Sequence, residues 1–221
     1  MTEDTREFQP SSIPSRIANR IRQRILAGDI LPGQRIKEHS FAREIGVSQG
    51  PVREALIQLE HEGFVTRHRN RGTTVTQLSS QEINDMVRVR ISLEVLAIEL
   101  AKKRLDSKNS MFLDQAVESM RAAVEHHSVD EFSKTDFAFH ETIWKMAGNQ
   151  ELLKTLKSLC SRVFAFGTIR STSTGWQVLP SYADMHSDLA QSILNDDLPT
   201  CSEKIREHIE YFWGEKRHVV G

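Results

Sequence analysis

The stretch GVSQGPVREAL, residues 46–56, predicts a tight turn that leads directly into a helix. Ser48 is a favourable N-cap residue, because its hydroxyl can accept a hydrogen bond from a free backbone N–H of the first turn. Pro51 lies near the helix start, where its missing N–H costs little. Just upstream, a shorter helix is expected to end at Gly46, since glycine readily adopts the left-handed conformation that closes a helix. Two short helices joined in this way form the helix-turn-helix pattern.

The start of the second helix is the part of this motif that meets base edges in the major groove of DNA. In this chain Gln49, Gly50 and Arg53 occupy that position. The motif therefore predicts that double-stranded DNA is a partner of this protein.

The flanking sequence completes a winged form of the motif. Isoleucines repeat every four residues from Ile13 to Ile25, with arginines between them, which predicts an amphipathic helix. After the motif, two runs rich in β-branched and aromatic residues, 64–66 and 73–76, bracket a basic hairpin tip. We therefore expect a winged helix-turn-helix over residues 13–78.

Basic side chains of this unit are candidates for contact with the DNA backbone. Arginines at the hairpin tip are compatible with a plain solvated loop, but their place beside a recognition helix favours contact with phosphate or the minor groove. Residues 1–78 carry 12 Lys+Arg against 9 Asp+Glu, whereas residues 79–221 carry 17 against 21, which is compatible with a DNA-binding front half. The predicted DNA contacts are Arg35, Arg43, Ser48, Gln49, Gly50, Arg53, Arg69, Arg71 and Gly72.

The second half shows no strand pattern and predicts helices throughout. Six segments are expected, at about 80–105, 109–127, 129–147, 150–171, 178–195 and 199–217. Six helices of these lengths can bury a full core as a bundle. The predicted fold class is thus mainly α, with a disordered tail over residues 1–12, the winged helix-turn-helix domain over 13–78 and an all-α domain over 79–221 for effector binding and dimerisation.

Composition excludes several classes of protein. Of the 221 residues, 38% are hydrophobic and 27% are charged, and no run of apolar residues is long enough to span a membrane. The first residues lack the apolar core of a signal peptide. Two cysteines are too few for a disulfide framework or a cysteine zinc site. We expect a cytoplasmic protein without a membrane partner.

Four polar side chains interrupt the apolar stripes of the predicted bundle helices. Asp136 and His140 lie four residues apart on one stripe, His186 lies on a second stripe and His208 on a third. A buried polar group without a partner costs roughly several kcal/mol, so something should satisfy these four. A divalent ion such as Zn, Ni, Co or Mn would do so, because Asp and His at this spacing put two ligands on one helical face. The alternative is that each side chain makes its own hydrogen bonds in the core. That explanation is the usual one for a lone histidine, but it is less favoured for four such residues on three stripes.

Two arginines are candidates for binding an organic acid in the same interior. Arg90 lies among apolar residues of the first bundle helix and could hold a carboxylate in forked geometry. An ion pair with Glu94, four residues on, explains Arg90 equally well. Arg162, which borders another apolar stripe, is the second candidate.

The DNA-binding half resembles a known family of bacterial regulators, the GntR family of winged-helix transcription regulators. The residues that carry the resemblance are Leu31-Pro32-Gly33, Phe41-Ala42, Gly46-Val47-Ser48, Pro51-Val52-Arg53-Glu54-Ala55-Leu56, Leu59, Glu62-Gly63-Phe64-Val65 and Arg71-Gly72. The family often carries arginine where this chain has Gln49. Since glutamine pairs with adenine and arginine prefers guanine, the operator is expected to differ at that base.

The second half resembles the FadR-type effector domain of the same family, and its six helices resemble the shorter, VanR-like branch. The matching residues are Arg90 with Glu94, Asp136 with His140, Gly148-Asn149, His186 and His208. The resemblance implies that the aspartate and the three histidines bind a divalent metal (Zn, Ni or Mn). It also implies that this metal, with nearby arginines, binds a small carboxylate effector.

The function expected is that of a ligand-responsive repressor. A homodimer would place two recognition helices about 34 Å apart on a pseudo-palindromic operator. Three alternatives stay open: a metal-responsive regulator, a metal-dependent hydrolase or isomerase on an all-α scaffold, and a structural dimer domain without ligand. An enzyme would need the ion to activate water and a general base, for which only Glu94 or Glu141 could be proposed.

Overall fold

The computed structural model describes residues 12–69, 71–174 and 179–213. The chain divides after Thr76 into two compact units, two residues before the boundary expected from the sequence. Most of the tail expected over residues 1–12 lies outside the described residues; its last residue, Ser12, caps the first helix by accepting a hydrogen bond from Ser15 N at 3.3 Å.

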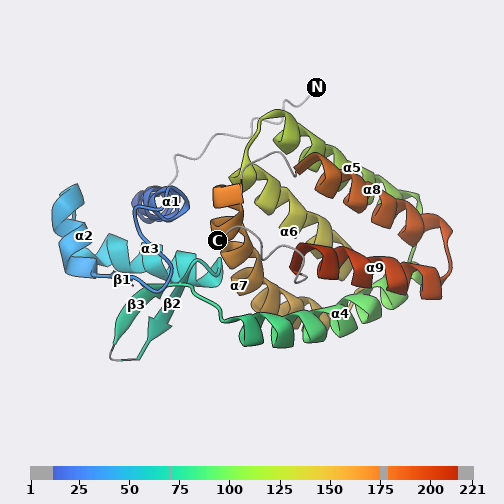
Figure 1. Ribbon diagram of the computed structural model, residues 1–221, viewed down its shortest axis with the longest axis horizontal. Helices are drawn as coiled ribbons and strands as arrows, with labels where there is room; N and C mark the ends of the chain where they lie inside the picture. The colour runs from blue at the N-terminus through green and yellow to red at the C-terminus, as the bar shows by residue number, and fades with distance from the viewer. Residues whose placement is uncertain (1–11, 70, 175–178, 214–221) are drawn as a thin grey trace, which may run out of the picture. The chain divides into compact units, whose positions relative to one another are not determined.

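The N-terminal unit is a winged helix-turn-helix, as predicted (Figure 1). Its described elements are α1 (Ile13–Leu26), β1 (Arg35–Ile36), α2 (Glu38–Ile45), α3 (Gln49–His61), β2 (Val65–His68) and β3 (Gly72–Val75). The sheet is antiparallel in the order β1-β3-β2. The hairpin was expected, but β1 was not, because two residues are too few to show an alternating pattern. The first hairpin strand also extends to His68, two residues further than expected.

The turn between α2 and α3 holds the motif together. Gly46 adopts φ +72° and its N–H bonds to Ala42 O, so α2 ends where the sequence predicted. Ser48 occupies the N-cap position of α3, but its side chain makes no capping hydrogen bond within the described structure, which corrects the prediction. The exposed hydroxyl and the free N–H groups of the first turn are therefore open to an anion such as phosphate.

The core of the N-terminal unit joins α1 to α3 by apolar packing, and a partly buried ion pair lies beside it. Ile21 and Ile25 of α1 and Leu56 and Leu59 of α3 are fully buried or nearly so. Arg22, expected on the polar face of α1, is buried as well. Its Nε donates to Glu62 Oε2 at 3.1 Å, and its Nη2 also contacts this oxygen.

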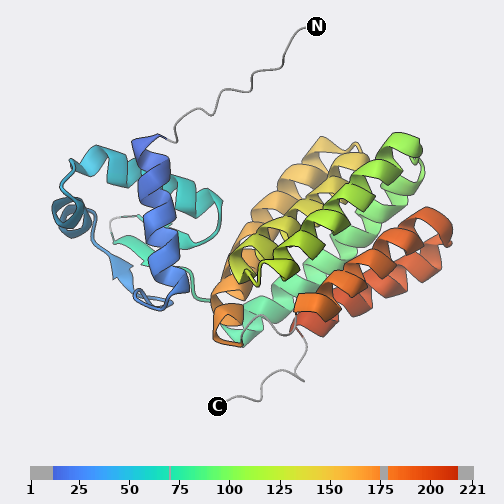
Figure 2. The same cartoon turned by 90° about the horizontal axis from the view of Figure 1, so that it is seen from above.

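The C-terminal unit is the predicted all-α bundle. Its helices in the described residues are α4 (Ser80–Lys102), α5 (Ser107–Glu125), α6 (Val129–Met146), α7 (Gln150–Thr174), α8 (Leu179–Asn195) and α9 (Leu198–Trp213). Figure 2 shows them running side by side, with α4 packed against α6, α7 and α9, and α5 packed against α6 and α8. The last helix was expected to reach residue 217, and residues beyond Trp213 lie outside the described part. None of the described helices combines the length and apolar character of a membrane span.

Local signals position α4 at the start of this unit. Ser79 and Glu82 form the predicted capping box: Ser79 N donates to Glu82 Oε2 at 2.9 Å, and Glu82 N donates to Ser79 Oγ at 3.2 Å. The helix then runs for 23 residues and buries Arg90 and Glu94 within the bundle. Cys160 of α7 fills core space nearby, and burial raises the pKa of its thiol to about 12, so it stays a neutral packing group.

Candidate metal centre and nucleic-acid interface

The nine residues predicted to contact DNA are all exposed on the N-terminal unit. Gln49 and Gly50 form the first turn of α3, and Arg53 follows one turn later on the same face as Gln49. Arg53 Nε donates to Glu38 Oε2 of α2 at 3.1 Å. This surface ion pair orients the side chain while the outer nitrogens of the guanidinium can meet a base or a phosphate.

The wing gathers a second group of basic residues. A Cβ atom on Gly72, whose φ is +83°, would lie 3.0 Å from Arg35 Nε, so glycine lets the guanidinium of Arg35 lie against the wing. Arg69 and Arg71 are exposed at the hairpin turn, where the intervening residue 70 lies outside the described chain. Arg35, Arg69 and Arg71 thus lie on the small sheet and its hairpin, whereas Arg43 lies on α2.

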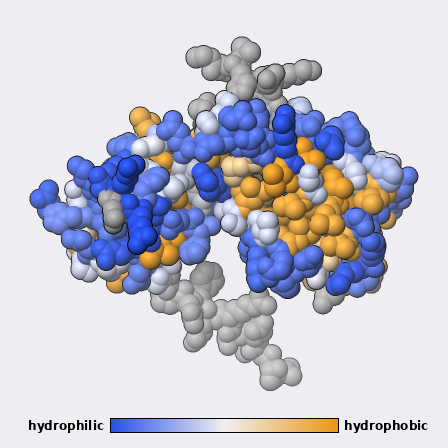
Figure 3. All heavy atoms as spheres, turned by 90° about the horizontal axis from the view of Figure 1, so that it is seen from below, coloured by the Kyte–Doolittle hydropathy of each residue, from blue (hydrophilic) through white to orange (hydrophobic). Residues whose placement is uncertain are grey.

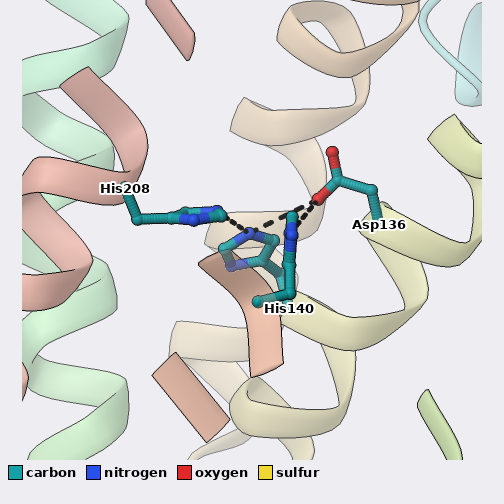
Figure 4. A group of neighbouring side chains, drawn as sticks. Asp136, His140 and His208 are labelled. Carbon is teal, nitrogen blue, oxygen red and sulfur yellow. Dashed lines mark hydrogen bonds and ion pairs between the residues drawn. The ribbon is translucent and has the colours of Figure 1, made fainter. Parts of the chain in front are cut away.

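The four side chains predicted to bind a metal converge inside the C-terminal unit. Asp136 and His140 come from α6, His186 from α8 and His208 from α9. Figure 4 shows Asp136, His140 and His208 pointing toward one another. One possible ligand atom from each of the four lies within 4.8 Å of the others. The three histidines are buried, and Asp136 is partly buried.

The spacing of these atoms fits a shared cation. Two neighbouring ligands, each bound at 2.0–2.1 Å from an ion, are separated by roughly 2.8–3.4 Å in octahedral or tetrahedral geometry. Asp136 Oδ1 lies 3.5 Å from His140 Nε2 and 2.9 Å from His186 Nε2. His140 Nε2 lies 3.3 Å from His208 Nε2, so two nitrogens that both favour a positive partner face each other. A carboxylate and three imidazoles are ligands that Zn, Ni and Mn accept.

Neighbouring groups orient two of the imidazoles. His186 Nδ1 donates to the backbone carbonyl of Tyr182 at 2.7 Å. His140 Nδ1 lies 3.2 Å from Glu94 Oε1, an ion-pair contact rather than a well-formed hydrogen bond. Both contacts favour a proton on Nδ1 and leave the Nε2 lone pair directed at the other ligands.

The protonation states also suit metal ligands. Burial lowers the pKa of His208 well below its usual value, and the nearby His186, His140 and Arg90 lower it further. Burial lowers the pKa of His140 too, although Glu94 opposes this effect. For Asp136, burial alone would raise the pKa, but His186, His140 and Arg90 outweigh it and lower the pKa. The lowered pKa values favour an ionised Asp136 carboxylate and neutral His140 and His208 imidazoles near pH 7.

The cluster forms the inner wall of a cavity. Arg90, the hydroxyl groups of Ser133 and Thr168, and several aromatic rings line the rest of the cavity. The rings are those of Phe132, Phe164, Tyr182, Phe212 and Trp213. The cavity is narrow: its own volume is about 40 Å³, and the empty space including its open mouth is about 610 Å³.

The two arginines predicted to bind the effector behave differently. Arg90 Nε donates to Glu94 Oε1 at 3.1 Å, whereas its buried Nη2 has no hydrogen-bond partner among the described residues. Arg90 therefore makes the ion pair and still has a donor for a ligand. Arg162 is exposed and does not line the cavity, which corrects that prediction. The buried face of α7 runs through Leu156, Cys160 and Val163, and position 162 falls beside it.

The sequence predicted the pair of Arg90 with Glu94, but it did not predict that Glu94 also contacts His140 and Trp144. Glu94 is fully buried and accepts from Arg90 Nε and, at 2.8 Å, from Trp144 Nε1. Burial would raise the pKa of Glu94, but His140, Arg90 and Trp144 lower it to about 2. The available signal was the position of Trp144, four residues after His140 on the same helical face. The aromatic walls had no such signal, since they come from four helices.

Comparison with known proteins agrees with this architecture. Residues 14–75 match the model of the bacterial regulatory proteins of the gntR family, and residues 85–211, more than half of the chain, match the FCD domain. The Nta operon transcriptional regulator of Aminobacter aminovorans is 29% identical over 86% of this chain and 87% of its own length. The gluconate operon transcriptional repressor of Bacillus subtilis is 35% identical over 58% of this chain and 52% of its own length.

A solved structure supports the fold alone. The structure of McbR/YncC from E. coli has a TM-score of 0.70 at 20% identity, covering 91% of this chain and 95% of that one. The matched families and these curated relatives are transcription regulators rather than enzymes, which removes the hydrolase alternative. The chain belongs to the GntR family of bacterial transcription regulators, with a gntR-type DNA-binding domain followed by an FCD ligand-binding domain.

Proposed function

We propose that this regulator is a repressor that binds a pseudo-palindromic operator as a homodimer and is released by a small organic acid bound at a metal centre. The observation that carries the proposal is the convergence of Asp136, His140, His186 and His208 on one wall of a cavity that Arg90 also lines. Repressors among the relatives support the direction of control.

The proposed centre consists of the four ligand side chains with Glu94 and Tyr182 O behind them. When bound, a divalent ion such as Zn, Ni or Mn would supply positive charge and a coordination position for a carboxylate oxygen. Arg90 Nη2 is a buried donor without a partner among the described residues, and it would donate to the other carboxylate oxygen. A small acid would thus satisfy groups that are otherwise costly to bury.

The proposed DNA contacts divide by role. Gln49, Gly50 and Arg53 at the start of α3 would meet base edges or the adjacent phosphates, and Ser48 would donate to a phosphate. Contacts that add salt-dependent affinity without reading sequence would come from four arginines and from the wing glycine: Arg35, Arg43, Arg69, Arg71 and Gly72.

The homodimer is supported by an unpartnered apolar face of α4. Figure 3 shows hydrophobic side chains gathered on the lower face of the C-terminal unit, the side on which α4 lies in Figure 1. Val89 and Leu96 of α4 are 51% and 39% exposed. Exposed apolar patches commonly mark interaction sites, and a second copy of the chain would cover this one and supply the second recognition helix.

Helix α4 also offers a route for control. It holds Arg90 and Glu94, and residues 77–79 join it directly to the DNA-binding unit. An acid that bound more tightly in one arrangement of the dimer than in another would shift the population of arrangements competent for the operator.

The test measures the affinity of the protein for an operator duplex selected from a random pool. Protein stripped with a chelator, protein reloaded with Zn²⁺, and reloaded protein with benzoate or citrate would be compared. We expect reloaded protein to bind the duplex and an acid to weaken that binding at least tenfold. His208→Ala should lose the acid response, whereas His126→Ala, which changes an exposed histidine, should keep it.

Other outcomes would overturn parts of the proposal. A change of operator affinity on metal addition, with no effect of any acid, would make the protein a metal-responsive regulator instead. Absence of bound metal in the reloaded protein would remove the proposed centre.

A further inference from the structure

Gly167 is an unexpected residue for the middle of α7, because glycine weakens a helix interior. A Cβ atom on Gly167 would lie 3.0 and 3.1 Å from two atoms of the Phe212 ring and 3.2 Å from the Trp213 ring. These are closer than ordinary van der Waals contacts. The missing side chain therefore makes room for the two aromatic rings at the end of α9.

Phe212 and Trp213, at the end of α9, form part of the cavity wall. Both line it, and their ring centroids lie 4.8 Å apart with the planes at 70°. Phe212 also packs on Tyr182 of α8, with ring centroids 5.5 Å apart. Phe212 follows His208 by one helical turn, and Trp213 follows it by about 7.5 Å of helix rise. The wall that rests on Gly167 is thus the end of the cavity away from the ligand cluster.

Two residues that line the cavity carry a donor without an acceptor among the described residues. Trp213 Nε1 is buried and lacks a hydrogen-bond partner among the described residues, as Arg90 Nη2 does at the inner end. In contrast, the hydroxyls of Ser133 and Thr168 bond to each other. A buried donor that stays unpaired is costly, so a ligand with an acceptor at each end would stabilise the site.

The space between the two ends suits a thin, mainly apolar body. The cavity is narrow, and between its polar ends the walls are largely aromatic. A sugar acid or a tricarboxylate would bring several hydroxyl or carboxylate groups against these rings without partners, which is unfavourable. A flat or extended body would instead pack against the ring faces.

We propose that Trp213, positioned by Gly167, is a specificity-determining residue that donates to a second acceptor oxygen at the far end of the effector. The effector is then a thin, mainly apolar acid with its carboxylate at the Arg90 end and an acceptor near the Trp213 indole. This inference rests on the proposed function, since it requires the acid to bind beside the metal ligands.

The test uses calorimetric titration of the Zn²⁺-loaded protein with benzoate, 4-acetylbenzoate, 4-isopropenylbenzoate and citrate. The two substituted benzoates match in shape, but only the acetyl group has an acceptor oxygen. We expect the acetyl compound to bind about tenfold more tightly than the isopropenyl compound, and both to bind more tightly than citrate. Trp213→Phe should reduce the tenfold difference between the two substituted benzoates to less than about twofold.

A second variant tests whether Gly167 positions the rings of Phe212 and Trp213. Gly167→Ala should push the rings inward and weaken binding of both substituted benzoates more than that of benzoate. Metal content and the circular dichroism spectrum should match the wild type, which would show that the bundle is intact.

The outcomes separate this inference from the proposed function. If benzoate binds but the acetyl and isopropenyl compounds bind equally, or Trp213→Phe keeps the difference, the role of Trp213 is wrong and the acid site stands. Tight binding of citrate with no binding of the benzoates would overturn the inference in the same way. If none of the four acids binds, both the inference and the proposed acid site fail.

Discussion

Glu94 is the residue on which the geometry of the centre depends most. It is fully buried, holds Arg90 and Trp144 by hydrogen bonds, and contacts His140 Nδ1. The sequence paired Glu94 with Arg90, four residues away, but the helical pattern alone could not predict its contacts with His140 and Trp144. Only the packing of α4 on α6 brings this carboxylate behind His140.

Replacing Glu94 by glutamine tests this role. Glu94→Gln keeps the size of the side chain but removes the charge that favours the Nδ1 proton of His140. We expect the affinity for Zn²⁺ to fall about 10- to 100-fold. Competition with a chromophoric chelator would measure it. Glu99→Gln, which changes an exposed carboxylate paired with Lys103 on the same helix, should leave the affinity unchanged, and an equal loss in both variants would contradict the role.

The lowered pKa values of His140 and His208 predict how acid affects the metal-free protein. In the folded state these imidazoles bind protons less readily than in the unfolded chain, where their pKa is about 6.5. Stability is therefore highest above pH 6.5 and falls as the pH drops below it, because the unfolded state takes up protons first. Zn²⁺ affinity should fall in the same direction, since protons compete for the ligands.

Urea denaturation of metal-free protein at pH 7.5 and 5.5 would measure this effect. Between pH 7.5 and pH 5.5, the free energy of unfolding should fall less in His208→Ala than in the wild type. A wild type that is more stable at pH 5.5 than at pH 7.5 would contradict the neutral imidazoles.

At the scale of elements, local signals were sufficient for some boundaries and insufficient for others. The capping box at Ser79 fixed the start of α4 because its contacts lie within three residues. The pairing of β1 with β3 depends on residues nearly forty positions apart, so no local pattern revealed it. Arg22 looked like a surface residue for the same reason, since its partner Glu62 is distant in the sequence.

The pair of Arg22 and Glu62 predicts an unequal response of two similar substitutions. Glu62→Ala removes the partner of the buried Arg22 guanidinium. Because Glu62 is 31% exposed, we expect the free energy of unfolding to fall by about 1–3 kcal/mol, which is less than for a fully buried pair. Glu44→Ala removes an exposed partner of Arg24 and should cost less than about 1 kcal/mol. Urea denaturation of both variants would measure the two losses of unfolding free energy, and equal losses would contradict a structural role for the pair of Arg22 and Glu62.

Helix α4 has two faces with different proposed roles. Arg90 and Glu94 lie on its buried face, whereas Val89 and Leu96 are exposed. Leu96→Glu should weaken dimerisation about tenfold or more, because it places a charge in an apolar contact. Sedimentation velocity would report the mass, and Gln81→Glu at the exposed start of the helix is the matched control. A dimer that survives Leu96→Glu unchanged would move the interface elsewhere.

At the scale of the whole molecule, the sequence predicted two units and their fold classes because each unit has its own periodicity. The convergence of Asp136 with three histidines followed from their places on apolar stripes, together with the family resemblance. The walls of the cavity did not follow, since Phe132, Phe164 and Phe212 belong to three helices whose packing angles set where the rings meet. Arg162 was misplaced for a related reason: a residue at the border of a stripe can face either way, and packing of α7 turned this one outward.

X-ray absorption at the Zn edge of the reloaded protein tests most directly whether one ion joins the four side chains. We expect one ion per chain, with three imidazole nitrogens at about 2.0–2.1 Å and a carboxylate oxygen at a similar distance. His208→Ala should remove one imidazole from the spectrum. An absent ion, or a coordination shell that keeps all its imidazoles in His208→Ala, would contradict the centre on which the proposed control depends.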